Sequence, residues 1–349
     1  MNHFNLLEGV AKFPKFMYPV LMSVESRIKQ KAIDIGFDVV GITSVAPLQP
    51  ASMESFVHWL DDGCAADMYY LQKNIDKRFS PERLLSNAKS IICFGLNYKP
   101  PELKTNPKNR NCGKIVSYAL YEDYHQFIKN KLRWFVIFLS EFVGRTFDFK
   151  ICVDSVPIAE RELAQRAGLG FVGKNHMLIN PKLGPQLFLA EIITNLDLKP
   201  DPPFAAIIGE KNEYFPSITC SHCNQCIEAC PTGALKKDGT FDARLCISYL
   251  TIEHKYQIPA HLKPKIENKL FGCEQCLLVC PYQRAAPVCK NSDIRFFPER
   301  GQIDLKDVLE LDKQQFDEHF VNSPIHRLGF ERLKRNAAIC MKNITGNVD

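Results

Sequence analysis

Seven of the chain's 14 cysteines lie in two short runs, and these runs constrain the fold more than any other feature. The first, CSHCNQCIEACP (220–231), has the spacing C-x2-C-x2-C-x3-C-P, and the second, CEQCLLVCP (273–281), has C-x2-C-x3-C-P. Outside an oxidising compartment, cysteines clustered in this way indicate metal ligands more often than disulfides. The backbone around both runs is therefore expected to fold about inorganic groups.

Zinc and iron–sulfur clusters are the two kinds of metal site to compare. Zinc favours paired C-x2-C knuckles that close one tetrahedron. The first run instead has the spacing of bacterial two-cluster ferredoxins, in which the fourth cysteine serves the other cluster. The second run is one cysteine short, and Cys246 is the nearest spare. We therefore predict two 4Fe–4S clusters, the first bound by Cys220, Cys223, Cys226 and Cys280 and the second by Cys230, Cys246, Cys273 and Cys276.

The rest of the composition is that of an ordinary globular protein. The 349 residues are 46% hydrophobic and 24% charged, with a formal charge of +5, which permits an anionic partner without requiring one. No stretch of about eighteen consecutive apolar residues is present, so we expect no membrane span. The first 22 residues are mixed in character and predict a loose arm rather than a signal peptide. We expect a cytoplasmic, monomeric protein of more than one domain.

Helical and strand patterns alternate through residues 23–200, which predicts an α/β domain with a mixed sheet. Helices are expected at 23–36, 51–73, 122–143 and 159–169, and strands at 38–43, 90–98, 114–120, 147–155 and in two later segments that include LFLAEIITN. The composition changes near residue 201. The predicted organisation is an N-terminal arm (1–22), the α/β domain (23–200), a ferredoxin-like two-cluster domain (201–290) and a C-terminal helical region (291–349) that closes with a basic amphipathic helix.

The segment VDSVPIAERELAQRAGLGFVGKNHMLI (153–179) carries most of the polar residues that suggest a function in the α/β domain. Asp154 ends a strand, and a glycine-rich turn leads into Lys174 and Asn175, where backbone amides could approach a polar cofactor. An ordinary strand–helix–strand connection is an equally good interpretation of the spacing. The turn matches neither a P-loop nor a dinucleotide-binding fingerprint, because its glycines follow a helix.

Several segments together resemble the epoxyqueuosine reductase family. They are GKIVSYALYEDYHQFIKNKL (113–132), VDSVPIAERELAQRAGLGFVGKN, the two cysteine runs and LKRNAAI near the C-terminus, so that the resemblance covers roughly residues 23–345. It implies a cobalamin-binding domain akin to that of reductive dehalogenases, two 4Fe–4S clusters and a short helical-repeat-like end. The implied reaction is the last step of queuosine synthesis, in which the epoxide of epoxyqueuosine at the wobble position (34) of tRNAs with GUN anticodons is reduced.

The resemblance also assigns roles to individual residues. Electrons would pass through the clusters to cobalamin, with Asp154 as proton donor. The implied cobalamin contacts are Arg78, Ser117, Asp154, Gly173, Lys174, Asn175, Leu178 and Glu253. The family binds cobalamin without a protein ligand to cobalt, and the nearest match to the ligand motif D-x-H-x-x-G, DEHFVN (317–322), is taken as chance. An ordinary carboxyl is ionised at neutral pH and cannot donate a proton. We expect the flanking Val153 and Val156 and a corrin plane over Asp154 to exclude water and so to raise its pKa.

The expected partners are tRNA and an external electron donor of the flavodoxin or ferredoxin type. Phosphate contacts need several cations and make binding salt-dependent. The candidate cations are Lys255, Lys263, Lys265, Lys269, Arg284, Arg327, Arg332, Lys334 and Arg335, any one of which alone is better explained as a surface charge. Chemistry on the wobble base also requires that base to leave the stack.

Three other functions remain open at this point. The chain could be an iron–sulfur electron-transfer subunit that binds no cobalamin. It could be a cobalamin-dependent reductase of a small molecule, like a reductive dehalogenase, although the twin-arginine signal common in those enzymes is absent. It could also be a tRNA-binding protein with structural clusters, which would leave the modified base unchanged.

Overall fold

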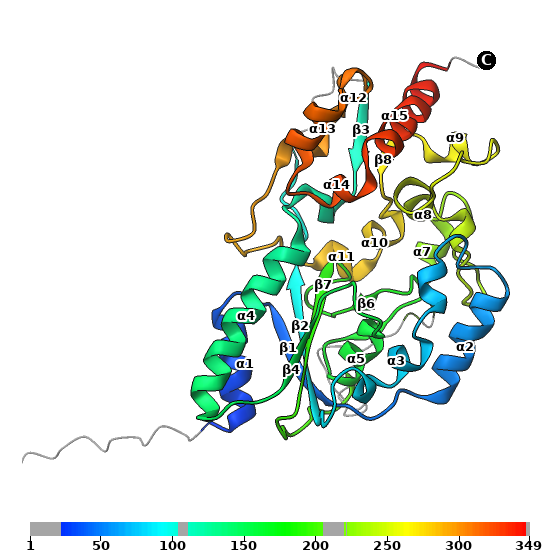
Figure 1. Ribbon diagram of the computed structural model, residues 1–349. Coiled ribbons are helices and arrows are strands. Elements are labelled where there is room, and N and C mark those ends of the chain that lie inside the picture. Colours follow the sequence, from blue (N-terminus) through cyan, green and yellow to red (C-terminus); the bar gives the residue numbers. More distant parts are fainter. Residues whose placement is uncertain (1–21, 104–110, 205–219, 221, 347–349) are drawn as a thin grey trace, which may run out of the picture.

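A four-stranded sheet forms the centre of the first half of the chain (Figure 1). The structure, a computed structural model, describes residues 22–103, 111–204, 220 and 222–346. The strand order is β1-β2-β7-β4, with bounds Val39–Ser44, Ser90–Asn97, Leu187–Thr194 and Phe149–Cys152. Every residue of β2 is buried, and every residue of β7 except Leu189 is buried too, because these two inner strands are covered on both faces.

The α/β class is confirmed, but one detail of the first domain differs from the prediction. All three strand pairings of the four-stranded sheet are antiparallel, whereas a mixed sheet was expected there. Strands β2 and β4 run in the same direction, and β7 lies between them antiparallel to both, so no two neighbours in this sheet are parallel. The alternation of strand and helix patterns in the sequence fits either direction of return.

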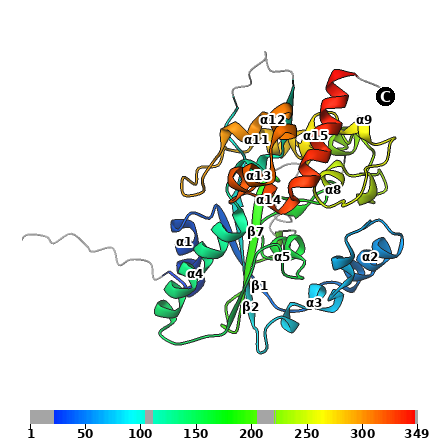
Figure 2. The same cartoon turned by 45° about the horizontal axis from the view of Figure 1, so that its top comes forward.

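Helices cover both faces of this sheet (Figure 1; Figure 2). On one face, α1 (Val24–Asp34) and α4 (Tyr124–Val143) enclose an apolar core rich in phenylalanine. The other face carries the second core, beneath α5 (Glu160–Arg166), with the hairpin β5–β6 beside it. The remaining elements on this side are α2 (Pro50–Asp61), η1 (Tyr69–Gln72), α3 (Ile75–Phe79), η2 (Pro81–Arg83), β5 (Phe171–Val172) and β6 (Leu178–Ile179).

A second sheet joins distant parts of the sequence. Its middle strand β3 (Cys112–Ile115) pairs parallel with β8 (Lys269–Phe271) and antiparallel with β9 (Ile303–Asp304). The strand predicted at 114–120 is therefore shorter, and its second half is the 3-10 helix η3 (Ser117–Leu120). The third apolar core contains residues from all three of these regions. The domain boundaries stay a prediction, but β3 packs with the second half of the chain.

Short helices dominate the rest of the chain. Those around the cysteine runs are α7 (Gln225–Glu228), η4 (Ala243–Leu245), α8 (Ile247–Ile252), α9 (Lys263–Ile266), α10 (Gln275–Leu278) and α11 (Pro281–Ala285). The later ones are η5 (Pro298–Gly301), α12 (Leu305–Glu310), α13 (Lys313–Phe320), α14 (Pro324–Leu328) and α15 (Phe330–Thr345). The single closing helix expected from the sequence is two helices, because the chain turns at Gly329, with φ of 89°.

Two further expectations concern the chain as a whole. Residues 1–21 of the predicted N-terminal arm lie outside the described residues, as does most of the segment that leads into the first cysteine run. Among the helices that the structure describes, none combines the length and the apolar character needed to cross a membrane.

Candidate active site and cluster site

The thiols of the two runs meet in two groups, and the first contains a cysteine from each run. Burial raises the pKa of Cys226, and the thiolates of Cys220 and Cys223 raise it further. The same two thiolates add to the effect of burial on the pKa of Cys280. Cys220 and Cys223 thus act electrostatically on both Cys226 and Cys280, and the assignment of these four cysteines to one cluster stays a prediction.

The second group has the complementary membership. Burial raises the pKa of Cys276, and the thiolates of Cys246, Cys273 and Cys230, with Cys226 of the first group, raise it further. Burial also raises the pKa of Cys273 to about 11, with contributions from Cys246 and Cys230. Cys246, the spare cysteine identified by counting, thus acts electrostatically on Cys273 and Cys276, and its role as a cluster ligand stays a prediction.

The chemistry of the donors fits two iron–sulfur clusters. Each group consists of thiols alone, the ligand set of a 4Fe–4S cluster. Within the described part of the chain, no three His, Cys, Asp or Glu side chains converge on a point where a single metal ion could bind. A cubane is larger than one ion, and its thiolates stand correspondingly further apart.

The glycine-rich turn predicted to contact a cofactor is hydrogen-bonded to both cysteine runs. The ammonium of Lys174 donates to the carbonyl oxygen of Cys223 at 3.0 Å and to Oδ1 of Asn224 at 2.9 Å. The Nδ2 amide of Asn175 donates to the carbonyl oxygen of Cys276 at 3.3 Å. These two side chains therefore connect the α/β domain to both cluster loops.

Three other predicted cofactor contacts are tightly enclosed by protein. A Cβ at Gly173 would lie 2.4 Å from Cδ1 of Ile179, so a larger residue there would require the Ile179 side chain to move. Leu178 is 2% exposed and belongs to the core beneath α5. Ser117 is 5% exposed, and its N–H and hydroxyl both donate to Oε1 of Glu274, at 3.1 and 2.7 Å.

Asp154 occupies a special backbone position directly after β4. Its φ is 55°, in the left-handed region that aspartate tolerates better than most residues. Its N–H donates to Oε1 of Glu160 at 2.9 Å, which fixes the turn against the start of α5. The Asp154 side chain is 52% exposed, so the carboxyl is available to a substrate.

The partner of Asp154 is His125, near the start of α4. Nε2 of His125 lies 2.9 Å from Oδ2 of Asp154, and Nδ1 lies 2.7 Å from Oδ1 of Asp123. Asp123 also accepts from the N–H of His125 as the cap of α4, so it is held as an acceptor and Nδ1 donates to it. Nη1 of Arg327, from α14, lies 2.7 Å from Nε2. Three distant segments thus meet at one imidazole.

In the protein alone, this pairing lowers the pKa of Asp154, whereas the predicted rise concerned desolvation under a corrin plane. The hydrogen bond with His125 is the largest influence and lowers the pKa of Asp154, and burial opposes it without prevailing. Burial lowers the pKa of His125, but its hydrogen bonds with Asp123 and Asp154 outweigh that effect and raise it. Desolvation therefore does not hold a proton on Asp154 alone. The proton belongs to the His125–Asp154 pair.

Two charged residues of α5 lie behind this pair. Burial raises the pKa of Glu160 to about 7, and the negative charge of Asp154 adds to the shift. Burial lowers the pKa of Arg161, and Glu160, Asp154 and the thiolate of Cys276 oppose that shift. The carboxylates of Glu160 and Asp154 and the thiol group that contains Cys276 therefore all act on the guanidinium of Arg161.

The remaining predicted cofactor contacts also surround this site. Nε of Arg78 is buried with no hydrogen-bond partner among the described residues, and its guanidinium carbon lies 5.5 Å from the centre of the Phe56 ring. Burial raises the pKa of Tyr70 to about 12, and the charges of Glu253 and Asp154 raise it as well. Glu253 is exposed. Its charge and that of Asp154 both act on the phenol of Tyr70.

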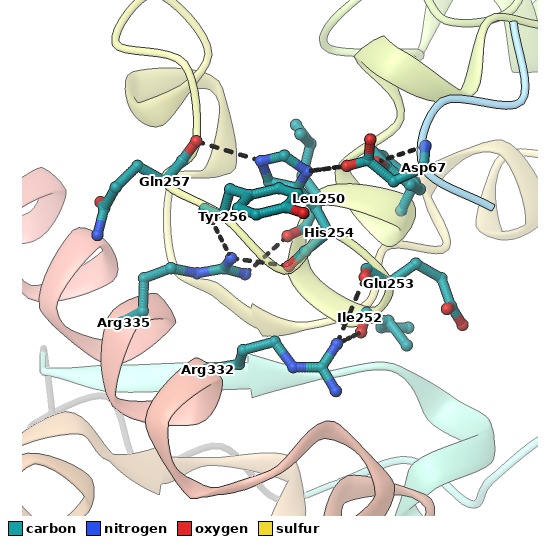
Figure 3. A network of polar contacts seen from close by, with 10 residues as sticks. Asp67, Leu250, Ile252, Glu253, His254, Tyr256, Gln257, Arg332 and Arg335 are labelled. Carbon is teal, nitrogen blue, oxygen red and sulfur yellow. Dashed lines mark hydrogen bonds and ion pairs between the residues drawn. The ribbon is translucent and has the colours of Figure 1, made fainter. Parts of the chain in front are cut away.

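Most of the basic residues proposed for tRNA phosphates in the last helix have internal partners instead (Figure 3). The guanidinium of Arg335 donates to three carbonyl oxygens at 2.6–2.9 Å, those of Leu250, His254 and Tyr256. Arg332 donates to the carbonyl oxygen of Ile252 at 2.8 Å. These oxygens lie at and beyond the C-terminal end of α8, where carbonyls lack helical partners and attract cations.

Others in the same set are also used within the chain. Lys334 donates to the carbonyl oxygen of Leu311 at 3.0 Å, and Lys269 is 6% exposed and ion-paired with Glu267. Arg327 belongs to the His125 site. The members that remain exposed are Lys255, Lys265 and Arg284.

Two residues of the site were missed, or assigned another role, by reasoning from the sequence. His125 carries no spacing signal of its own, but it lies inside the segment GKIVSYALYEDYHQFIKNKL that resembles a known family. Arg327 was grouped with phosphate-binding cations because its neighbours are basic. Its approach to His125 depends on how α14 packs against the start of α4, which no local pattern records.

Comparisons with protein families agree with the two halves of this site. The family model described as "Epoxyqueuosine reductase QueG, DUF1730" matches residues 78–155, a range that contains His125 and Asp154. The model described as "4Fe-4S double cluster binding domain" matches residues 219–283, a range that contains both cysteine runs.

Two curated relatives are similar to this chain over most of their length. A curated relative from Cyclobacterium marinum, named epoxyqueuosine reductase, is 37% identical over 309 residues that cover 88% of this chain and 94% of the relative. Another of that name, from Vibrio cholerae, is 35% identical over 322 residues that cover 91% of this chain and 83% of the relative.

Two solved structures of epoxyqueuosine reductases also match the fold of this chain. A crystal structure of epoxyqueuosine reductase with a tRNA-Tyr epoxyqueuosine-modified tRNA stem loop matches with a TM-score of 0.82 and 30% identity, covering 92% of this chain and 81% of that one. The structure of epoxyqueuosine reductase from Streptococcus thermophilus matches with a TM-score of 0.81 and 29% identity, covering 92% and 82%.

Proposed function

Because this chain belongs to the epoxyqueuosine reductase family, we propose that it reduces the epoxide of epoxyqueuosine at the wobble position of tRNA to the alkene of queuosine. It is an oxidoreductase. The observation that carries the proposal is the exposed Asp154 carboxyl, hydrogen-bonded to His125, in the electrostatic neighbourhood of a four-thiol group. An acid next to an electron source is what removal of an epoxide oxygen requires.

The cofactors proposed are two 4Fe–4S clusters on the eight thiols and one cobalamin beside Asp154. Cobalamin carries several amide side chains. Nε of Arg78 and Nε2 of His176, which have no hydrogen-bond partner among the residues that the structure describes, are suitable polar atoms to meet them. Glu253 and the backbone at Gly173 line the same neighbourhood and complete the proposed contacts. When bound, cobalamin supplies a low-valent cobalt that reacts with the epoxide, and the clusters supply single electrons.

The residues of this chain hold and donate the proton that the leaving oxygen takes up. Asp123 fixes the orientation of His125 through Nδ1, so that Nε2 faces Asp154. Burial lowers the pKa of His125, but its two carboxylate partners outweigh that effect and raise it, which favours a proton on the His125–Asp154 pair. The exposed carboxyl of Asp154 then presents that proton to the oxygen that leaves the epoxide. The order of electron transfer, from the clusters to cobalamin, stays a prediction.

The proposed partners follow from this reaction. A tRNA anticodon loop with its modified base out of the stack would bring the epoxide to Asp154, and the exposed Lys255, Lys265 and Arg284 are the cations proposed to contact its phosphates. A flavodoxin- or ferredoxin-type protein is the proposed electron donor. We place the reaction in the cytosol, where the cluster thiols stay reduced.

The test is an anaerobic assay of the reconstituted protein with cobalamin, a chemical reductant and tRNA that carries epoxyqueuosine. The tRNA is digested and its nucleosides are analysed by mass spectrometry. We expect loss of one oxygen mass that depends on cobalamin, loss of turnover in Asp154→Asn, and full turnover in the control Asp197→Asn, whose side chain is 83% exposed. Unchanged tRNA, with clusters and cobalamin both bound, would instead support a reductase of a small molecule.

A further inference from the structure

An arginine from the C-terminal region, Arg327 of α14, contacts the imidazole of the active site. Its Nη1 lies 2.7 Å from Nε2 of His125 and 3.3 Å from Nδ1. An atom in line with one ring nitrogen would lie much farther from the other, so the guanidinium approaches the face of the ring. Nε2 is hydrogen-bonded to Oδ2 of Asp154 at 2.9 Å. Arg327 therefore acts on His125 through its charge and leaves the bond with Asp154 in place.

Backbone and side-chain hydrogen bonds bring Arg327 to this position. The N–H of Asp123, the cap of α4, donates to the carbonyl oxygen of Asn322 at 3.2 Å, and Nδ2 of Asn322 donates to Oε2 of Glu122 at 3.1 Å. The carbonyl oxygen of Arg327 accepts from Nη2 of Arg332 at 3.3 Å. The turn before α14 is thus hydrogen-bonded to the turn before α4, and the arginine follows from that contact.

His125 is an unusual partner for an arginine. Among the residues that the structure describes, Arg327 forms no ion pair with a carboxylate, although Asp123 and Asp154 both bind the same imidazole. A guanidinium gains most from a bidentate carboxylate. Arg327 is also exposed, so packing does not require it here. An effect on His125 explains its position better than stability does.

The electrostatic effect of this contact has a definite sign. A positive charge against the ring disfavours the imidazolium, because like charges repel. The His125 side chain is only 12% exposed, so water screens this repulsion less than it does at the surface. The charge of Arg327 also lowers the pKa of Asp154 and of Asp123. His125 and both of its carboxylate partners therefore hold a proton less tightly when Arg327 is present.

Other charged and titratable groups face the His125–Asp154 pair from the elements packed around it. They are Asp123 and Tyr124 at the start of α4, Tyr118 of η3, Tyr70 of η1, and Glu160 and Arg161 of α5. Arg161 donates to the carbonyl oxygen of His176 at 2.7 Å and acts on Asp154 through its charge. Arg327 differs from Arg161 because it touches the imidazole itself.

We propose that Arg327 is a positioning residue that acts through His125, its charge loosening the shared proton so that Asp154 can release it to the oxygen leaving the epoxide. This inference rests on the proposed function. Conversion of an epoxide to an alkene breaks two C–O bonds, forms one C=C bond and releases the oxygen as water, which consumes two electrons and two protons. The His125–Asp154 pair donates one proton, solvent supplies the other, and the external donor supplies the electrons.

The proton affinity of His125 can be measured without turnover. The cluster-loaded protein, with 13C at Cε1 of its histidines, is titrated by NMR, and the His125 signal is assigned by its absence from His125→Asn. We expect the titration midpoint to rise by about half a pH unit or more in Arg327→Met, because a like charge has been removed. Arg327→Lys, which keeps the charge, should have the midpoint of the parent. Arg133→Met, which removes an exposed arginine of α4, is the control.

Turnover tests the consequence for the reaction. In Arg327→Met, the pH above which kcat falls should rise together with the His125 midpoint. Below that pH, kcat should be lower by about threefold or more, because a weaker acid donates its proton more slowly. Arg327→Lys should restore both properties. If Arg327 served only to bind a tRNA phosphate, KM for tRNA would rise while the pH profile and the midpoint stayed those of the parent, and that result would overturn the proposal.

A second variant and a substrate-free readout keep the test independent of folding and of the proposed function. If Arg327→Met folds poorly, Arg327→Gln replaces it, because an amide can still donate to the ring without a charge. An unchanged midpoint in these neutral variants would overturn the proposal. A parent that leaves epoxyqueuosine unchanged would lose the assigned reaction and keep the effect of Arg327 on His125. A parent that reduces epoxyqueuosine, with the same midpoint in Arg327→Met, would keep the reaction and lose this inference.

Discussion

At the scale of single residues, the active site depends on one proton shared between His125 and Asp154. Neither partner has the pKa of an isolated side chain, because each stabilises the charged form of the other. Removing either partner should therefore remove the same function. Effects of residues that act as a unit are far from additive.

A double-mutant cycle checks this expectation. His125→Asn and Asp154→Asn should each lower kcat by about 100-fold or more, the usual contribution of general acid catalysis, and the double variant should be little worse than either. His58→Gln, with a side chain that is 79% exposed, is the control. In the parent, kcat should fall as pH rises past the raised pKa of His125, because the pair then loses its proton. Independent, multiplying losses would contradict a shared proton.

Glu191 gives a second residue-scale prediction, on stability. A carboxyl whose pKa is raised in the folded state binds a proton there that the unfolded chain has lost, so stability falls as pH rises above its ordinary value of 4.5. Glu191→Gln removes this loss. Its Tm relative to the parent should rise by about 2 °C per pH unit between pH 5 and 7. Differential scanning calorimetry measures the difference, and a constant offset across pH would mean that Glu191 is ionised in the folded protein.

The cysteine ligands could be predicted from the sequence, whereas His125 could not. Ligand spacing is local, and a simple count of thiols identified Cys246 as the missing member. The position of His125 depends on α4, the end of β4 and α14 coming together, and these elements are distant in sequence. The prediction for the pKa of Asp154 considered desolvation under a corrin plane and not this partner, which lowers the pKa in the protein alone.

At the scale of elements, α15 stabilises α8 through its arginines. Helix α8 begins after Cys246, a predicted cluster ligand, and its C-terminal carbonyls receive the guanidinium of Arg335 (Figure 3). Burial lowers the pKa of Arg335 to about 10, with Arg332 adding to the shift, so the charge is retained at neutral pH. Loss of this cation would leave several helix-end carbonyls without donors.

Arg335→Met should therefore weaken both the fold and the second cluster. Hydrogen bonds to a charged group contribute about 1.5–3 kcal/mol, which predicts a Tm several degrees lower. We also expect faster bleaching of iron–sulfur absorbance in air, because the helix that follows Cys246 is less firmly held. Lys306→Met, on exposed α12, is the control. Unchanged Tm and bleaching would mean that the α8 carbonyls find other donors.

Long apolar elements could be predicted from sequence, and their ends and pairings could not. The buried strands β2 and β7 and the helices α1 and α4 lie where their patterns indicate. The segment at 114–120 reads as one strand, yet only β3 finds pairing partners, β8 and β9. Those partners come from the second half of the chain, so the end of β3 is set by tertiary contacts rather than by local propensity.

At the scale of the whole molecule, three predicted regions combine in one site. The α/β segment contributes Asp154 and His125, the cysteine runs lie against its glycine-rich turn, and α14 of the C-terminal region contributes Arg327. Basic residues of the second half therefore fall into two classes. Those with internal partners hold regions together, and the exposed ones remain for an anionic partner.

The salt dependence of tRNA binding distinguishes these two classes. Lys255 is exposed, so Lys255→Met should leave Tm unchanged and reduce the slope of log affinity against log salt by about 0.7–0.9, the value for one lost phosphate contact. Arg335→Met should do the opposite, lowering Tm and leaving the slope unchanged, because its guanidinium already binds carbonyl oxygens. Fluorescence titrations of a labelled anticodon stem loop at several salt concentrations measure the slope. Equal slopes for the parent and Lys255→Met would remove Lys255 from the tRNA surface, and a reduced slope in Arg335→Met would show that internal pairing does not exclude that arginine from phosphate binding.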